Sequence, residues 1–450
     1  MKNWKGQCYT VLSMAVLVSL LSACGGGAKN AGEADTPAGK GTEGKEQVET
    51  APKEKTEPVD IIFYSDSGGS VEEFENLYGA ALKKKFPNYN VTYLMKQKGG
   101  TLRELLTAGQ TIDIIYDSIG MFPDSVIGSG LSYDMSGLIK EAGVDLNKLE
   151  PTMLDAMRKL SNGGLYGLPV RYATMLLYYN KDIFDKFGVE YPVDGMTWEQ
   201  TIELGNKLTR SDGDVVYAGF SISEGHYMRM NPFSLPYVDS KAQKVTINSD
   251  EKWKTFFQTI LVAPTESAGY QNYFSAKKLS KMPSTNEFSK SQDLAMLGWL
   301  SGAEFPGMNV NVVAMPTFSE LPGVGTQAYP TYYSVTSTSK HKKEAMEIIA
   351  YLVSEEFQMI LSKRGILPAV QTDAIKNAFG SESNIKNLNT KAFFYNKLAP
   401  ISEKLVFDSA IETEYRKDVG KLVTRQIDLN TFLRNAEERG ATKLKEELSK

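Results

Sequence analysis

Between residues 59 and 118 the chain alternates short apolar runs with helical patterns, and this alternation constrains the fold more than any other feature. The apolar run Val59–Tyr64 stops at a loop rich in serine and glycine and is followed by a helical pattern through Phe86. A strand, a helix and a buried strand are then predicted at 90–94, 102–107 and 112–116. Alternating strands and helices predict a mainly parallel sheet in an α/β fold.

The loops after the first and third of these strands contain candidate ligand contacts. Ligands bind beyond the carboxyl ends of parallel strands, so both loops should face one crevice. They contain Asp66, Ser67 and Asp117. The alternative for these residues is a turn or cap role. The pair Gly68-Gly69 could bind an anion before a helix, but it lacks the spacing of a nucleotide-binding motif.

The first 24 residues have the pattern of a secretory signal that ends at a lipidation site. Lys2 and Lys5 precede an apolar run from Val11 to Leu21, and small residues lead to Cys24. The run is too short for a stable membrane span, so residues 1–23 should be removed and the Cys24 thiol acylated. Such a lipid would anchor the protein on the outer face of the cell membrane, which we assign to a Gram-positive bacterium. The alternative is an ordinary signal peptide with a chance cysteine.

The composition distinguishes a flexible linker from a folded part that is long enough to bury two hydrophobic cores. Residues 24–57 contain almost no large apolar side chain and are predicted to be a flexible linker. The chain has 450 residues, of which 42% are hydrophobic, so the remainder can bury two hydrophobic cores. The two cysteines, Cys8 and Cys24, leave the mature part without a disulfide or a thiol nucleophile.

Charge and histidine content argue against a nucleic-acid-binding protein and against a zinc protein. The formal charge of −4 has both signs interspersed, which gives no electrostatic footprint for nucleic acid. The two histidines, His226 and His341, lie far apart in the sequence, which argues against a zinc site. No metal or cofactor is therefore predicted.

Several motifs after residue 57 follow one another in an order typical of a single family. They are Leu165–Val170, Leu177–Phe184, Met196–Glu199, Val312–Pro316, Ser339–Ser354, Gly365–Pro368 and Asp428–Thr431. This ordered set resembles the extracellular solute-binding proteins of the maltose-binding-protein-like family, the receptor components of ABC importers. The same segments also carry ordinary local signals, such as Thr197 as the N-cap of a helix.

The resemblance implies a two-lobed α/β fold of the type II periplasmic-binding-protein kind, with a ligand cleft between the lobes and a three-segment hinge. The first lobe is expected to comprise 58–170 and 319–368, and the second 176–314 and 373–450. The crossings are then expected near 171–175, 315–318 and 368–372. Short segments of this kind can absorb a hinge rotation.

Sugar recognition needs flat apolar faces and planar polar groups, and the chain has candidates of both kinds. Trp299 follows an apolar strand where the family commonly has an aromatic residue that stacks on the ligand; the alternative is core packing. Further candidates lie near the expected crossings or in loops: Arg171, Tyr172, His226, Tyr332 and Tyr333. Arg171 could instead form an ion pair between the lobes.

The remaining aromatic residues have simpler interpretations. Trp198 and Trp253 belong to amphipathic helices and are predicted to be structural. Strand alternation predicts that one ring of the pair Tyr178 and Tyr179 is buried and the other exposed. Adjacent tyrosines would also suit Fe³⁺, which prefers hard oxygen ligands.

The resemblance implies a monomeric receptor that captures a carbohydrate, with an oligosaccharide favoured, and delivers it to a membrane permease without chemistry. The signal pattern at 1–24 adds the lipid anchor. A receptor for ferric ion, a polyamine or a peptide is one alternative. A surface glycoside hydrolase is another, although no local signature singles out a pair of carboxylates. A sensor that reports its ligand to a membrane kinase would share the same fold.

Overall fold

The computed structural model describes residues 58–449. The predicted signal at 1–23, the lipidation site Cys24 and the linker at 24–57 lie outside this range. Within it, no helix combines the length and the apolar character needed to cross a membrane.

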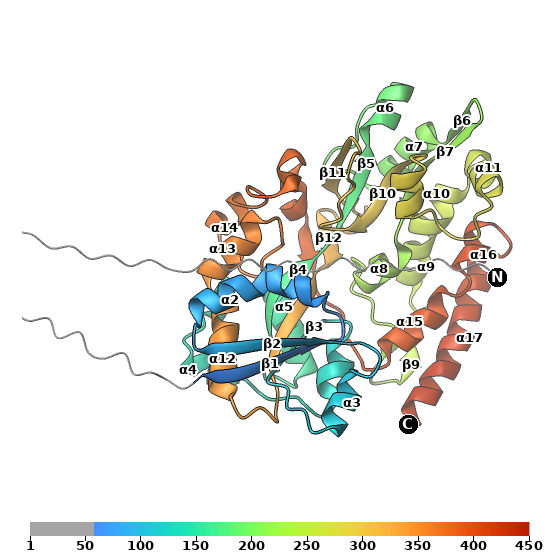
Figure 1. Cartoon of the computed structure of the whole chain (residues 1–450). Helices are drawn as coiled ribbons and strands as arrows, with labels where there is room; N and C mark the ends of the chain where they lie inside the picture. Colours follow the sequence, from blue (N-terminus) through green and yellow to red (C-terminus); the bar gives the residue numbers. More distant parts are fainter. Residues whose placement is uncertain (1–57, 450) are drawn as a thin grey trace, which may run out of the picture. The chain divides into compact units, whose positions relative to one another are not determined.

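The first lobe is built on a five-stranded sheet (Figure 1). Its strands, in spatial order, are β2 (Tyr89–Met95), β1 (Val59–Ser65), β3 (Ile114–Ser118), β13 (Tyr329–Val335) and β4 (Leu168–Ala173). Strand β1 pairs in parallel with β2 and β3, which confirms the predicted parallel sheet. Strand β13 comes from late in the chain and runs antiparallel to both β3 and β4.

The second lobe is built on another five-stranded sheet. Its order is β11 (Val310–Ala314), β5 (Met175–Asn180), β10 (Leu294–Leu300), β7 (Val215–Ile222) and β6 (Arg210–Asp212). Strands β7 and β10 are parallel, so their carboxyl ends meet at one edge of the sheet. Two small sheets pair β12 (Val324–Gln327) with β14 (Lys397–Ala399) and β8 (Val238–Asp239) with β9 (Lys244–Val245).

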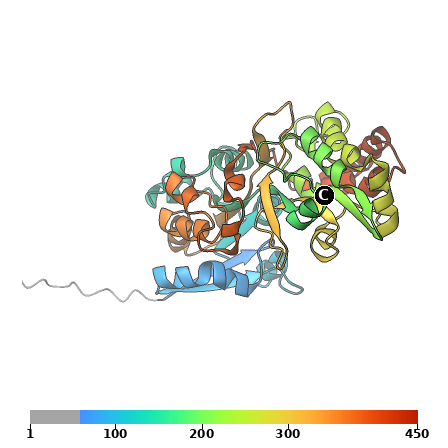
Figure 2. The same ribbon diagram turned by 90° about the horizontal axis from the view of Figure 1, so that it is seen from above.

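Helices surround both sheets. Those with the first sheet are α1 (Val71–Phe74), α2 (Ala80–Lys85), α3 (Leu102–Thr107), α4 (Ser136–Glu141), α5 (Pro151–Leu160), α12 (Lys342–Leu352), α13 (Glu355–Lys363) and α14 (Asp373–Asn377). Those with the second are α6 (Lys181–Phe187), α7 (Trp198–Leu208), α8 (Glu224–Arg229), α9 (Glu251–Phe257), α10 (Ala263–Thr265), α11 (Ala268–Lys277), α15 (Asp408–Arg416), α16 (Val419–Val423) and α17 (Leu429–Leu448). Figure 2 shows the orange helices of the later chain beside the blue and teal elements of its beginning.

Local signals placed several of these helices correctly. The Thr197 side chain accepts a hydrogen bond from the Gln200 N–H in a capping box, so the predicted N-cap of α7 is confirmed. Trp198 and Trp253 are both fully buried, which confirms their structural role.

The expected exposure of one tyrosine in strand β5 is wrong. Tyr178 and Tyr179 are both buried, because helices and loops cover β5 on both faces of its sheet. The Tyr178 ring packs edge-on against Phe305, and the Tyr179 ring packs against Phe184. Period-2 alternation distinguishes the two faces of a strand, but it does not show that the second face is also covered.

The chain passes between the two sheets three times. Thr174 alone separates β4 of the first sheet from β5 of the second. Its hydroxyl lies 2.8 Å from that of Thr326, in the segment that leads from β11 back to β13. A hydrogen bond therefore links the first two segments that connect the two sheets.

The third change of sheet comes later than the expected 368–372. Helix α14 still packs against α13, and the Gly380 N–H donates to the Ser362 carbonyl at 2.8 Å. Contact with the second lobe is present at Asn389, whose side chain donates to Asp194 at 2.8 Å. The difference arises because residues 367–369 pair with strand β4 and remain with the first lobe.

Candidate functional site

The loops after β1 and β3 come together, as predicted, and Asp117 holds them. Its Oδ1 accepts hydrogen bonds from the Ser65 hydroxyl at 3.0 Å and from the N–H groups of Asp66 and Ser67 at 3.0 and 2.8 Å. Asp117 is fully buried, and this burial raises the pKa of its carboxyl group. Its interior position makes Asp117 an anchor for the loop, in contrast to the expected ligand contact.

Asp66 and Ser67 remain at the surface of this loop. The Asp66 carboxylate accepts a hydrogen bond from the Tyr64 hydroxyl at 2.7 Å and lies 3.6 Å from the Lys96 ammonium. Ser67 is exposed, and its hydroxyl accepts a hydrogen bond from the Ser118 N–H at 2.9 Å. Ser67 is thus open to solvent at this edge of the first sheet, whereas the Asp66 side chain is only 13% exposed.

His226 and Trp299 come together at the matching edge of the second sheet. Helix α8 starts directly after β7, Trp299 lies near the end of β10, and Gly298 is in register with Ile222. The two rings meet edge-on, with centroids 5.5 Å apart. Trp299 is partly exposed, which leaves part of its indole free for contact.

His226 is a neutral polar group in this arrangement. Its Nδ1 lies 2.6 Å from the Ser223 hydroxyl. Burial lowers the pKa of His226, and the neighbouring Arg229 lowers it further. At neutral pH the imidazole therefore offers one donor and one acceptor without a charge.

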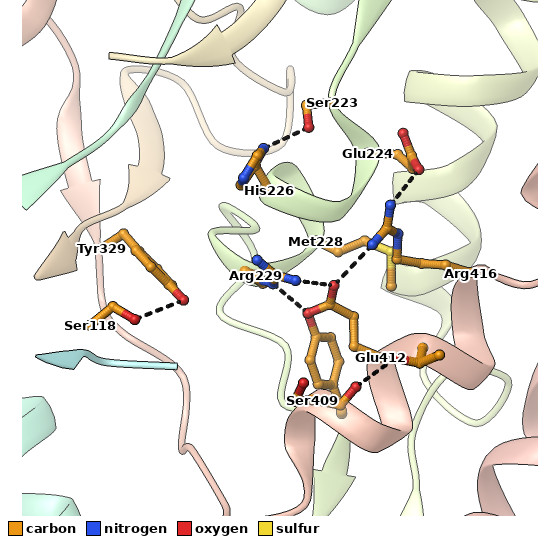
Figure 3. Close-up of polar contacts among 12 residues, drawn as sticks. Ser118, Ser223, Glu224, His226, Met228, Arg229, Tyr329, Ser409, Glu412 and Arg416 are labelled. Carbon is orange, nitrogen blue, oxygen red and sulfur yellow. Dashed lines mark hydrogen bonds and ion pairs between the residues drawn. The ribbon is translucent and has the colours of Figure 1, made fainter. Parts of the chain in front are cut away.

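Tyr329 and Ser118 face this edge from the first lobe, and both lie opposite His226 and Arg229 (Figure 3). The two hydroxyl oxygens are 3.4 Å apart, and Tyr329 interacts electrostatically with Arg229. A Cβ atom at Gly120 would lie 2.3 Å from the Tyr329 hydroxyl, so glycine is needed there for the ring to adopt this position. We call Ser118, Tyr329, His226, Arg229 and Trp299 the facing site.

A charged network positions Arg229. Glu412, whose side chain is only 4% exposed, accepts two hydrogen bonds from Arg229, at 2.6 and 2.9 Å. The Tyr237 hydroxyl donates to Glu412 at 3.2 Å, and Arg416 bridges Glu412 and Glu224 at 3.4 and 2.8 Å (Figure 3). Two arginines are thus neutralised by two glutamates, and the network joins α8 to α15.

A pocket of about 260 Å³ lies beside this network, between the loop after β3, the end of α5 and residues 402–407. The Lys404 ammonium donates to the Ser402 hydroxyl at 2.8 Å and to the Arg229 carbonyl at 3.3 Å. Burial raises the pKa of the nearby Asp408 to about 6. Sequence reasoning missed these residues, as it missed Tyr329 and Arg229, because no local motif marks them.

The tyrosines proposed as ligand contacts lie inside the first lobe. Tyr332 and Tyr333 are fully buried, because β13 is an inner strand covered on both faces. The Tyr332 hydroxyl donates to the Met153 carbonyl at 2.6 Å, and the Tyr333 ring stacks on Tyr116 at 4.9 Å. Tyr172 is also buried. Tyr332 and Tyr333 differ from the expectation, since neither ring is open to a solute in this structure, whereas Tyr172 lines a separate pocket of about 380 Å³.

The remaining candidate, Arg171, is partly buried and lines a different pocket in the first lobe. Within residues 58–449, no group of three or more histidine, cysteine, aspartate or glutamate side chains is arranged to hold a metal ion. The facing site therefore offers an aromatic surface and neutral and charged hydrogen-bonding groups, which suit the binding of a polar solute.

Residues 67–359 match the family model described as bacterial extracellular solute-binding protein. The chain is 28% identical over 180 residues to the arabinooligosaccharide-binding protein of Bacillus subtilis (strain 168), which covers 38% of this chain and 40% of that protein. It is 33% identical over 110 residues to the mannitol-binding protein of Pseudomonas aeruginosa, which covers 24% of each. The chain thus matches less than half of the length of these relatives.

Solved structures show the same fold across most of the chain. A sugar transporter protein from Rhizobium etli in an open conformation superposes with a TM-score of 0.65 at 19% identity, over 85% of this chain and 99% of that one. An ABC substrate-binding protein from Listeria monocytogenes in complex with cycloalternan superposes with a TM-score of 0.63 at 19% identity, over 87% of this chain and 100% of that one. With its two-lobed type II fold and a family match over residues 67–359, the chain belongs to the bacterial extracellular solute-binding proteins, which confirms the resemblance seen in its motifs.

Proposed function

We propose that this protein is the carbohydrate receptor of an ABC importer and that it binds an oligosaccharide at the facing site. The observation that carries the proposal is the partly exposed Trp299 ring beside the neutral His226, together with the position of His226 opposite Ser118 and Tyr329 (Figure 3). An indole face can pack against the C–H surface of a sugar ring, and the surrounding polar groups can bind its hydroxyls. The arabinooligosaccharide-binding and mannitol-binding relatives support this solute class.

Binding is coupled to closure in this proposal. Ser118 and Tyr329 belong to one lobe and His226 and Trp299 to the other, so one solute must contact both lobes to use all four groups. A solute shifts an open and closed equilibrium by its difference in affinity for the two states. Small-angle scattering with and without the solute measures this closure.

Trp299→Ala should weaken the binding of the preferred oligosaccharide by about 1–3 kcal/mol, because the variant loses an aromatic stacking surface. The melting temperature without ligand should fall only slightly, since the ring is already partly exposed. The measurement is calorimetric titration with a panel of oligosaccharides and polyols that is first screened by thermal shift.

Tyr395→Ala is the matched control, because this aromatic side chain is 54% exposed and is not part of the facing site. It should bind like the wild type. A Trp299→Ala protein that melts early but binds normally below its transition would show that the ring belongs to the core.

Ferric ion, polyamines and peptides in the same thermal-shift screen test the alternative solute classes. Chromatography of the sugars recovered after incubation tests whether the protein hydrolyses them.

We further propose that the mature protein is anchored by a lipid on Cys24, on the basis of the signal pattern at 1–23. Cys24→Ser should remove the acylation site, so the protein should move from the detergent phase to the aqueous phase, or remain unprocessed. Phase partitioning after expression in a Gram-positive host measures this. Wild-type membrane binding with normal processing of the variant would contradict the anchor.

A further inference from the structure

A second pocket, of about 420 Å³, lies within the first lobe. Its polar lining comes from the π-helical turn Glu75–Gly79, from β3 and β4, and from the end of α13. The side chains that matter for its chemistry are Tyr78, Tyr116, Arg171 and Arg364. Gly69 also lines the pocket, so the pocket borders the loop that carries Asp66 and Ser67.

Two arginines of this pocket have no acidic partner. Among residues 58–449, neither Arg171 nor Arg364 forms an ion pair with a carboxylate, and the Arg171 Nε is buried without a hydrogen-bond acceptor. Arg364 donates one hydrogen bond, to the Asn76 carbonyl at 2.8 Å. Glu73 also lines the pocket, but its carboxylate caps α1 by accepting from the Ser70 N–H at 2.8 Å.

A buried tyrosine hydroxyl also lines the same pocket. Tyr78 is 2% exposed, and its buried hydroxyl makes no geometrically formed hydrogen bond among residues 58–449, although it interacts electrostatically with Arg171. The buried hydroxyl of Tyr333, whose ring lies 5.7 Å from that of Tyr78, has none either. Buried polar groups are usually paired, so the unpaired Arg171 Nε and Tyr78 hydroxyl at this pocket indicate a missing polar ligand.

The charge of this pocket contrasts with that of the facing site. Arg229 and Arg416 are neutralised by Glu412 and Glu224, whereas Arg171 and Arg364 keep their charge unopposed. Arginine stays protonated at physiological pH, and its planar fork of donors matches carboxylate and phosphate groups. A partly buried cation without a partner is unfavourable, and an anion entering the pocket would remove this penalty.

We infer that this pocket binds the acidic group of the transported solute, so that the solute is an acidic carbohydrate bearing a carboxylate or a phosphate. Arg171 and Arg364 would hold the anionic oxygens, and the Tyr78 hydroxyl would donate a further hydrogen bond. This inference rests on the proposed function and specifies the solute class within it.

The test compares acidic carbohydrates with neutral counterparts of the same shape. The probes are uronate di- and trisaccharides with their carboxyl-reduced forms, and glucose 6-phosphate with glucose, each titrated calorimetrically against the wild type. At least one acidic probe should bind about 10- to 100-fold more tightly than its neutral counterpart, and this preference should shrink as salt is added. The two probe series distinguish a carboxylate from a phosphate.

Variants then locate the acidic group. Arg364→Gln and Arg171→Gln should each remove most of the preference for the acidic probe while binding of the neutral counterpart is retained. Arg364 is exposed, so its variant tests the pocket without a change in the core. Arg158→Gln is the matched control, because this exposed arginine pairs only with Asp155 on α5 and should keep the full preference.

Three results would overturn the inference. They are equal binding of acidic and neutral forms, no binding of any acidic probe, and an unchanged acidic preference in both Arg171→Gln and Arg364→Gln. In the first case neutral oligosaccharides still bind, and the proposed carbohydrate receptor stands. The proposed function fails separately, when no carbohydrate of either charge binds and the Trp299→Ala substitution changes no affinity.

Discussion

Replacing Glu412 with alanine should lower the free energy of unfolding by about 3–5 kcal/mol. The substitution removes the buried carboxylate that pairs with Arg229 and Arg416 and accepts a hydrogen bond from Tyr237. The two guanidinium groups would then lie beside each other without this shared anion. Urea unfolding followed by tryptophan fluorescence measures the change.

The control for this variant is Glu438→Ala, an exposed glutamate on α17, which should change stability by less than about 0.5 kcal/mol. Glu412→Gln should have an intermediate effect, because the amide keeps one acceptor but loses the charge. A loss below about 1 kcal/mol in Glu412→Ala would show that packing alone, and not the ionic network, joins α8 to α15.

Replacing Asp117 with alanine should also destabilise the protein by about 3–5 kcal/mol, because several donors lose their acceptor at once. Asp117 Oδ1 accepts from Ser65, Asp66 and Ser67, and these bonds hold the loop after β1 against the end of β3. Because Ser67 in turn accepts from the Ser118 N–H, solute binding should weaken as well. Thermal unfolding and solute titration on the same variant measure the two effects.

Asp117→Asn separates the acceptor from the charge. Its amide oxygen can still accept from the loop, so the loss should stay below about 2 kcal/mol and solute binding should be largely retained. If Asp117→Asn and Asp117→Ala are equally unstable, the charge and not the hydrogen-bonded loop is the stabilising feature. If Asp117→Ala folds normally but loses solute binding, Asp117 is a ligand contact after all.

Elements that depend on neighbouring residues could be predicted from the sequence. The helix at 102–107 and the N-cap Thr197 agree with the structure, because capping and apolar periodicity act within a few residues. The parallel pairing of β1 with β2 and β3 also follows from a repeated strand and helix order. The two-lobed arrangement is predicted by the family resemblance and not by these local signals.

Features that depend on residues far apart could not be predicted in the same way. Strand β13 enters the first sheet between β3 and β4, which buries Tyr332 and Tyr333. The third change of sheet comes after α14, because residues 367–369 pair with β4. Neither pairing leaves a periodic pattern in the local sequence.

The same distinction between local and distant residues applies to the candidate site. Its individual residues His226 and Trp299 could be proposed from the sequence and its family resemblance, which also implies a carbohydrate solute. The tertiary structure decided that these two rings meet, that Tyr329 and Ser118 face them, and that Glu412 neutralises Arg229 from 183 positions away. Within residues 58–449 it also left the Arg171 Nε without a hydrogen-bond acceptor. Local sequence governs backbone conformation within a few residues, whereas strand register and charge pairing depend on which distant segments the packed core brings into contact.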